Sequence, residues 1–195
     1  MADEHEHTVR DVAALRAIAH PIRSKLIALL RYDGPATASE LGRRLDESSG
    51  STSYHLRQLA KYGFVEEDPE QPNRRDKRWR AAQRITSWSR AELATDPEGR
   101  EISDALERRQ VLRAVEDFQR WFASREQRDP RWDELGGAFD DLLRLAPSQL
   151  AALYTDLLAV FARYRTEPPA PEQPGEPVSH TRIYLHLLPF EEMPL

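Results

Sequence analysis

The sequence predicts a mainly helical protein with a small β component, and three observations support this fold class. Apolar residues recur at helical spacing through most of the first 62 residues. Two short extended runs with a cationic stretch between them follow, as in a β-hairpin. A helical pattern then continues from Asp96 to about Arg128 without a helix-breaking residue. We therefore expect a compact helical domain, a hairpin and a long helix in that order.

Composition limits the class of protein. The chain has 195 residues, 39% of them hydrophobic, which is enough to form a packed core. It has no cysteine, so disulfides and thiolate metal sites are excluded. The N-terminus is acidic and lacks the apolar stretch of a signal peptide, and no apolar run approaches the roughly 20 residues that span a membrane. We expect a soluble cytoplasmic protein without a membrane partner.

The charge is unevenly distributed along the chain. The net charge is −5. Residues 1–90 contain 16 basic and 13 acidic residues, a balance of +3, whereas residues 91–195 contain 12 and 20, a balance of −8. Residues 10–90 alone carry +6, because the first nine residues hold three acids. A basic first half and an acidic second half indicate different roles, and the first is suited to a polyanion.

Four helices are predicted before the hairpin. The first covers residues 8–19, with Thr8 as its cap, and His20-Pro21 ends it, since the residue before proline avoids the helical region. The second covers residues 21–32. The turn at 33–35 leads to Thr37-Ala38-Ser39-Glu40, a capping box that opens a third helix at 38–45. Polar residues at 46–48 then turn into a fourth helix.

This fourth helix, residues 50–62, has the character of a recognition helix. Its start is rich in serine, whose hydroxyl can cap free amides, and Gly63 follows its last turn. A narrow inward stripe consists of Thr52, Leu56 and Leu59. The opposite face carries hydrogen-bonding groups in place of aliphatic ones: Ser51, Tyr54, His55, Gln58 and Lys61. For His55 a position inside the helix packing is an equal alternative.

The hairpin resembles the wing of a winged helix-turn-helix. Its strands are predicted around Phe64–Glu67 and Trp79–Ala81, joined by a basic tip. The tip residues are Arg74, Arg75, Lys77 and Arg78, for which we expect phosphate or minor-groove contact rather than plain solvation. Neighbouring acids would repel phosphate, so we expect the wing to contribute more to discrimination between DNA sequences than to overall attraction.

The order of helices and hairpin is that of a winged helix-turn-helix, which places its recognition helix in the DNA major groove. The predicted DNA-binding residues are Ser49, Ser51, Thr52, Ser53, Tyr54, His55, Arg57, Gln58, Lys61, Arg74, Arg75, Lys77 and Arg78. Among them we expect Tyr54 and Gln58 at base edges, and Ser51, Ser53 and Lys61 at phosphates.

Residues 10–82 resemble the ArsR-type winged-helix repressors. The resemblance lies in His20–Arg23 (HPIR), Ala38–Leu41 (ASEL), Ser53–Leu59 (SYHLRQL) and Tyr62–Glu66 (YGFVE). It implies a homodimeric bacterial transcription regulator, a repressor, in which Ser51, Ser53 and Tyr54 touch DNA. The sequence departs from metal-sensing members, whose third helix bears cysteines, and it continues about a hundred residues beyond the usual small domain.

The predicted long helix, residues 91–128, needs a partner along its length. Its apolar positions repeat at helical spacing, and in this fold the helix after the wing pairs across a two-fold axis. The predicted dimer interface consists of Leu106, Val111, Val115, Phe118 and Phe122.

Residues 129–195 are predicted to form a small α+β extension. It contains a strand at Phe139–Leu145 (a helical turn is the alternative), a helix at about 147–165 and a proline-rich linker at 167–177. A second strand at about 179–189 would pair with the first or with the other protomer. The remaining organisation is a flexible acidic tail at 1–9 and a DNA-binding domain at 10–90.

Other functions fit the sequence less well. No nucleophile elbow, Walker loop or dinucleotide fingerprint is present, so we expect no enzyme and no cofactor. His5 and His7 supply only two ligands, too few for a metal site. Aromatic residues in the second half could line a pocket for a small apolar effector, although core and dimer packing explains them better. A second alternative is a winged-helix module that binds proteins and has lost strong DNA binding.

Overall fold

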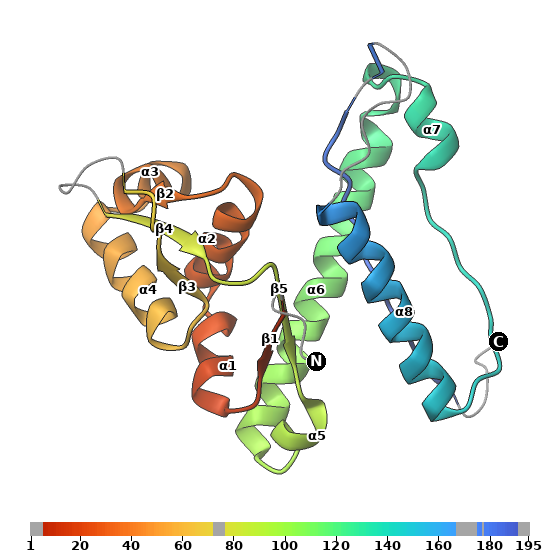
Figure 1. Ribbon diagram of the computed structural model, residues 1–195, viewed down its shortest axis with the longest axis horizontal. Coiled ribbons are helices and arrows are strands. Elements are labelled where there is room, and N and C mark those ends of the chain that lie inside the picture. The colour runs from red at the N-terminus through yellow and green to blue at the C-terminus, as the bar shows by residue number, and fades with distance from the viewer. Residues whose placement is uncertain (1–5, 72–76, 167–174, 177, 191–195) are drawn as a thin grey trace. The chain divides into compact units, whose positions relative to one another are not determined.

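The computed structural model describes residues 6–71, 77–166, 175–176 and 178–190. The chain divides into two compact units, residues 1–112 and residues 113–195, and each is described by itself. The predicted fold class, mainly helical with few strands and a winged helix-turn-helix domain, is confirmed (Figure 1).

The four predicted helices of the first unit are present. They are α1 (Val12–Ala19), α2 (Pro21–Tyr32), α3 (Ala38–Leu45) and α4 (Ser49–Lys61). Pro21 opens α2, where its missing N–H costs nothing. The prediction that Thr8 caps the first helix is wrong, because the Asp11 carboxylate accepts from the Ala14 amide at 2.8 Å and α1 begins only at Val12.

The wing is a three-stranded antiparallel sheet. Strand β4 (Arg78–Ala81) lies between β2 (Ala36–Thr37) and β3 (Val65–Glu67). The predicted hairpin is present, and in it β3 and β4 pair with Val65 opposite Ala81 and Glu66 opposite Arg80. Strand β2 was not predicted, since two residues carry no periodicity.

The N-terminal segment corrects a prediction. Residues Glu6–Val9, expected to belong to a flexible tail, form strand β1, which pairs in parallel with β5 (Ile85–Trp88). Val9 is only 1% exposed, and the Ser89 amide donates to its carbonyl at 3.1 Å. The burial of Val9 and the pairing with β5 keep this segment in a strand, although its composition alone predicts disorder.

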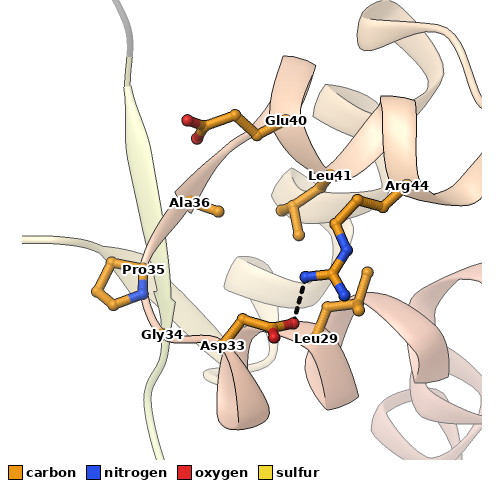
Figure 2. Close-up of a pocket in the computed structure, with 8 residues that line it drawn as sticks. All are labelled: Leu29, Asp33, Gly34, Pro35, Ala36, Glu40, Leu41 and Arg44. Carbon is orange, nitrogen blue, oxygen red and sulfur yellow. Dashed lines mark hydrogen bonds and ion pairs between the residues drawn. The ribbon is translucent and has the colours of Figure 1, made fainter.

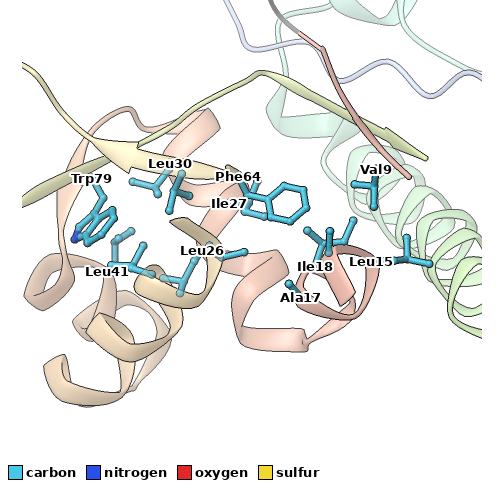
Figure 3. Close-up of a cluster of buried hydrophobic side chains, with 14 of the residues drawn as sticks. Val9, Leu15, Ala17, Ile18, Leu26, Ile27, Leu30, Leu41, Phe64 and Trp79 are labelled. Atoms are coloured by element: carbon cyan, nitrogen blue, oxygen red, sulfur yellow. The ribbon is translucent and has the colours of Figure 1, made fainter. Parts of the chain in front are cut away.

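One hydrophobic core organises the first unit (Figure 3). Leu15, Leu26, Leu56, Leu59 and Phe64 are at most 1% exposed. Burying each such side chain contributes about 1.5–3 kcal/mol. Leu41 of α3 belongs to the same core, so all four helices and the start of the wing share a single core, which fixes the position of α4.

The helix after the wing packs partly on this core. A short helix α5 (Arg90–Leu93) precedes α6 (Pro97–Ala123), and Leu106 packs against the core from α6. Leu106, which is predicted at the dimer interface, is half-buried and packs against the core of its own unit. Helix α6 begins at the predicted Pro97 but ends at Ala123, before the predicted Arg128. The Ser124 hydroxyl donates to the Trp121 carbonyl at 2.9 Å where the chain leaves the helix.

The second unit contains the end of α6, a 3₁₀ turn (Arg125–Gln127), α7 (Arg131–Leu135) and α8 (Pro147–Thr166). Helix α8 confirms the predicted helix at 147–165. The two strands predicted at Phe139–Leu145 and 179–189 are wrong, because the residues in both ranges form no regular structure. Apart from residues 175 and 176, the predicted linker at 167–177 lies outside the described residues. None of the residues described in this unit is buried.

Candidate nucleic-acid interface

The turn between α3 and α4 is built from local hydrogen bonds. Thr37 Oγ1 accepts from the Glu40 amide at 3.2 Å, and the Thr37 amide donates to Glu40 Oε2 at 2.7 Å, which completes the predicted capping box. The hydrogen bond from the Thr37 amide holds the pKa of Glu40 below its usual value. Helix α3 ends at Asp46, which adopts a left-handed conformation with φ 56°. The short helix is thus fixed at both ends.

Close approach of the two helices depends on Gly42. A Cβ atom at this position would lie 2.7 Å from the Glu47 carbonyl oxygen and 3.1 Å from Thr52 Oγ1. Ser48 caps α4, since its Oγ accepts from the Ser51 amide at 3.1 Å. Figure 1 shows α3 and α4 next to each other, with the wing strands beside them.

Helix α4 has one buried and one polar face. The Tyr54 side chain is 52% exposed, and Gln58 one turn later is partly exposed. The remaining members of the polar face are exposed or partly exposed: Ser49, Ser51, Ser53, Arg57 and Lys61. Tyrosine, glutamine and serine side chains offer the donors and acceptors that base edges and phosphates require.

Two residues predicted to bind DNA are in fact inside. Thr52 is 0% exposed, and its hydroxyl donates to the Ser48 carbonyl at 3.0 Å. His55 is 8% exposed and packs against His20, with the ring centroids 4.7 Å apart and the ring planes tilted by 40°. Both lie on the same side of α4 as Leu56 and Leu59. Their side chains therefore pack the helix against the rest of the domain and do not contact a ligand.

The described cations of the wing are paired with carboxylates. Lys77 Nζ lies 2.6 Å from Glu67 Oε1, and Arg80 Nη2 lies 2.6 Å from Glu66 Oε1. Arg78 lies 3.9 Å from Asp68 and also donates to the Pro35 carbonyl. The remaining predicted wing contacts, Arg74 and Arg75, lie outside the described residues. The described part of the wing therefore presents little free positive charge.

The cations of the helix-turn-helix are different. Arg43 on α3 and Arg57 and Lys61 on α4 are exposed, and none forms an ion pair with a described residue. Arg57 also borders a hollow between α3, α4 and β4, together with Ser39, Ser53 and Lys77. Free guanidinium and hydroxyl groups at one hollow are suited to a phosphate oxygen. Arg43 and Ser39 are not among the DNA-binding residues predicted from the sequence, although Ser39 lies at the start of the third predicted helix and Arg43 on its outer side.

A separate pocket lies between α2 and α3 (Figure 2). Leu29 and Leu41 form its apolar part, and Arg44 reaches across it to pair with Asp33. Glu40 at its rim is held by Thr37. Because these charged groups satisfy one another, the pocket offers no free polar group to orient a ligand.

Across the described ranges, no group of three or more histidine, aspartate or glutamate side chains is placed to hold a metal ion. None of the described helices is long and apolar enough to cross a membrane.

A family model described as a helix-turn-helix domain matches residues 18–68. The match begins at the end of α1 and ends just after β3, so the chain contains a helix-turn-helix domain. No curated protein sequence matches the chain.

Several solved structures are similar to the chain, among them a ZitR mutant and an AbfR. An apo-form mutant of ZitR from Lactococcus lactis is 9% identical, covers 75% of this chain and 83% of its own, and has a TM-score of 0.33. A disulfide-formed AbfR is 14% identical, covers 60% of this chain and 81% of its own, and has a TM-score of 0.30.

Proposed function

We propose that the protein is a sequence-specific DNA-binding transcriptional regulator, a repressor, that acts as a homodimer on palindromic operators. The observation that carries this proposal is the exposed polar face of α4, with Tyr54 and Gln58 at its centre. Arg57 and Lys61, which form no ion pair with a described residue, lie beside them. A helix with this composition at the second position of a helix-turn-helix is suited to the major groove.

Charge and hydrogen-bonding capacity indicate which side chains of the interface contact bases and which contact the DNA backbone. Gln58 offers an amide that can pair with the N6 and N7 atoms of adenine. Arg57, Arg43 and Lys61 supply the charge that displaces counterions from the backbone. Paired wing cations contribute less, because each must first leave its carboxylate.

The homodimer is supported by an apolar stripe on α6. Val111, Val115, Phe118 and Phe122 follow one another at spacings of four, three and four residues, and each is 44–54% exposed. Contiguous exposed apolar surface of this kind is typical of a protein interface. The second unit, which has no buried residue among those described, also needs a further surface to complete its core. We propose that a second copy supplies it.

In such a dimer each α4 would enter one half-site, and half-site centres would lie about 34–36 Å apart or a multiple of this distance. The net charge of −5 is the observation that favours the alternative, a winged-helix module that binds protein and not DNA. A small apolar effector acting on the second unit remains a further proposal.

Genome-wide selection of bound fragments by the purified protein tests the function. We expect enrichment of a palindromic site, including DNA upstream of the protein's own gene, and loss of that enrichment in a Tyr54→Ala/Gln58→Ala variant. Recovery of the same fragments by the variant, or of none by the wild type, would favour the alternative.

A further inference from the structure

Two histidine rings join the recognition helix to the scaffold. His55 projects from the buried side of α4, and His20 is the residue that precedes α2. Their ring centroids are 4.7 Å apart, with 40° between the planes. The Tyr54 ring lies edge-on to the His55 ring, with the ring centroids 5.4 Å apart. Tyr54, at the centre of the exposed face of α4, therefore contacts the histidine pair.

The surroundings of the pair do not accommodate positive charge. The Nδ1 atoms of both rings are buried and have no hydrogen-bond partner among the described residues. Arg23, on the first turn of α2, holds a guanidinium near both rings, fixed by its Nε donating to the Ala17 carbonyl at 2.6 Å. Glu47, in the turn before α4, is the acidic group that acts in the opposite direction.

These neighbours set the direction of the titration. Burial lowers the pKa of both histidines, and the Arg23 charge lowers the pKa of each further, more than Glu47 raises it. The rings are thus neutral in the folded domain at pH 7, and protonating both would place two cations 4.7 Å apart beside a third.

We propose that the His20–His55 pair is an acid-sensitive latch, which holds α4 in its docked position when neutral and releases it when protonated. The proposal rests on the proposed function, because the consequence of release is loss of DNA binding. A ligand that binds only the docked state loses affinity in proportion to the fraction undocked. Protonation of exposed histidines would have the opposite effect on DNA affinity, since added positive charge strengthens binding to a polyanion.

The experiment compares wild type with a His20→Phe/His55→Phe variant, which keeps two aromatic rings and removes the titration. His186→Gln in the second unit is the matched control. Affinity for a selected duplex is measured by fluorescence anisotropy from pH 7.5 to 5.5 at constant ionic strength. We expect wild type and control to lose about tenfold or more in affinity, whereas the double variant stays level or gains. An equal pH response in wild type and double variant overturns the latch.

Two readouts without DNA separate the latch from the proposed function. Ring proton resonances of wild type should titrate below pH 6.5 for His20 and His55, and the urea midpoint of wild type should fall on acidification more than that of the double variant. If these hold while no duplex binds at any pH, the latch stands and the DNA-binding function fails. If both rings titrate at 6.5 or above, the latch is wrong whatever the DNA result, and this test does not depend on the variant folding.

Discussion

Lys77 Nζ lies 2.6 Å from Glu67 Oε1 across the wing, so the cation nearest the hairpin tip among the described residues is already neutralised. Arg57, which borders the same hollow as Lys77, has no such carboxylate among the described residues. The two side chains carry the same charge, but within the described part of the chain only Lys77 is paired with a carboxylate, which it must leave before it can replace a counterion on DNA. The helix and the wing therefore differ in whether their cations are paired with carboxylates, and not in how many cations they have.

Removing Arg57 should therefore cost more than removing Lys77. For Arg57→Ala we expect weaker binding to all duplexes and a salt slope reduced by about 0.9, the value of one phosphate contact. For Lys77→Ala we expect a smaller change in both. Filter binding from 50 to 300 mM salt measures the two slopes. Equal salt slopes for the two variants would contradict the claim that Arg57 contacts phosphate more readily than Lys77.

Base recognition should be confined to the exposed face of α4. Gln58→Ala should cost about 1–3 kcal/mol on the selected site and little on random duplex, because it removes a base contact and not a phosphate contact. Lys61→Ala is the control, which should weaken both duplexes alike. Competition titrations with the two duplexes measure both affinities. An equal loss of affinity for both duplexes in Gln58→Ala would exclude base readout by this residue.

The close packing of α3 and α4 gives a stability prediction. Gly42→Ala should destabilise the domain by about 1–3 kcal/mol, because its Cβ would lie 2.7 Å from a backbone oxygen. Gly50→Ala should be neutral or stabilising by up to about 1 kcal/mol, because the nearest atom to its Cβ would be the Ser48 side-chain oxygen at 3.9 Å, an ordinary contact distance. Urea unfolding followed by circular dichroism measures both, and a Gly42→Ala variant as stable as wild type would show that the helices can separate freely.

Local signals account for what the sequence predicted well. The capping box at Thr37 and Glu40, the proline at position 21 and the glycine at position 63 are each read from neighbouring residues, and the corresponding helix ends are where the structure has them. The polar face of α4 follows from helical periodicity alone. Tyr54 and Gln58 are therefore on the surface as expected.

Non-local pairing accounts for the errors. Strand β1 exists only because Glu6–Val9 meets Ile85–Trp88, nearly 80 residues away in the chain. Helical periodicity allows His55 on either face of α4, and its buried position is seen only in its contact with His20, which precedes α2, and in its proximity to Arg23 of α2. The alternating pattern at 179–189 finds no partner strand among the described residues, so periodicity without pairing forms no sheet.

The apolar stripe on α6 predicts a dimer that one charge disrupts. Phe118→Glu should turn a dimer into a monomer at micromolar concentration, because a carboxylate in an apolar interface is left unpaired. Gln119→Glu, one position along, makes a similar change in charge and should leave the dimer intact. Sedimentation velocity measures both. A monomeric wild type, or a dimeric Phe118→Glu variant, would remove the interface from this helix.

Chemical protection of a selected site tests most directly whether α4 lies in the major groove. Dimethyl sulfate modifies guanine N7 in the major groove and adenine N3 in the minor groove, so one experiment reports on both. We predict that the protein protects guanine N7 in each half-site and that Tyr54→Ala/Gln58→Ala abolishes this protection. Protection of adenine N3 alone, or major-groove protection that survives in the variant, would contradict the assignment of α4 as the recognition helix.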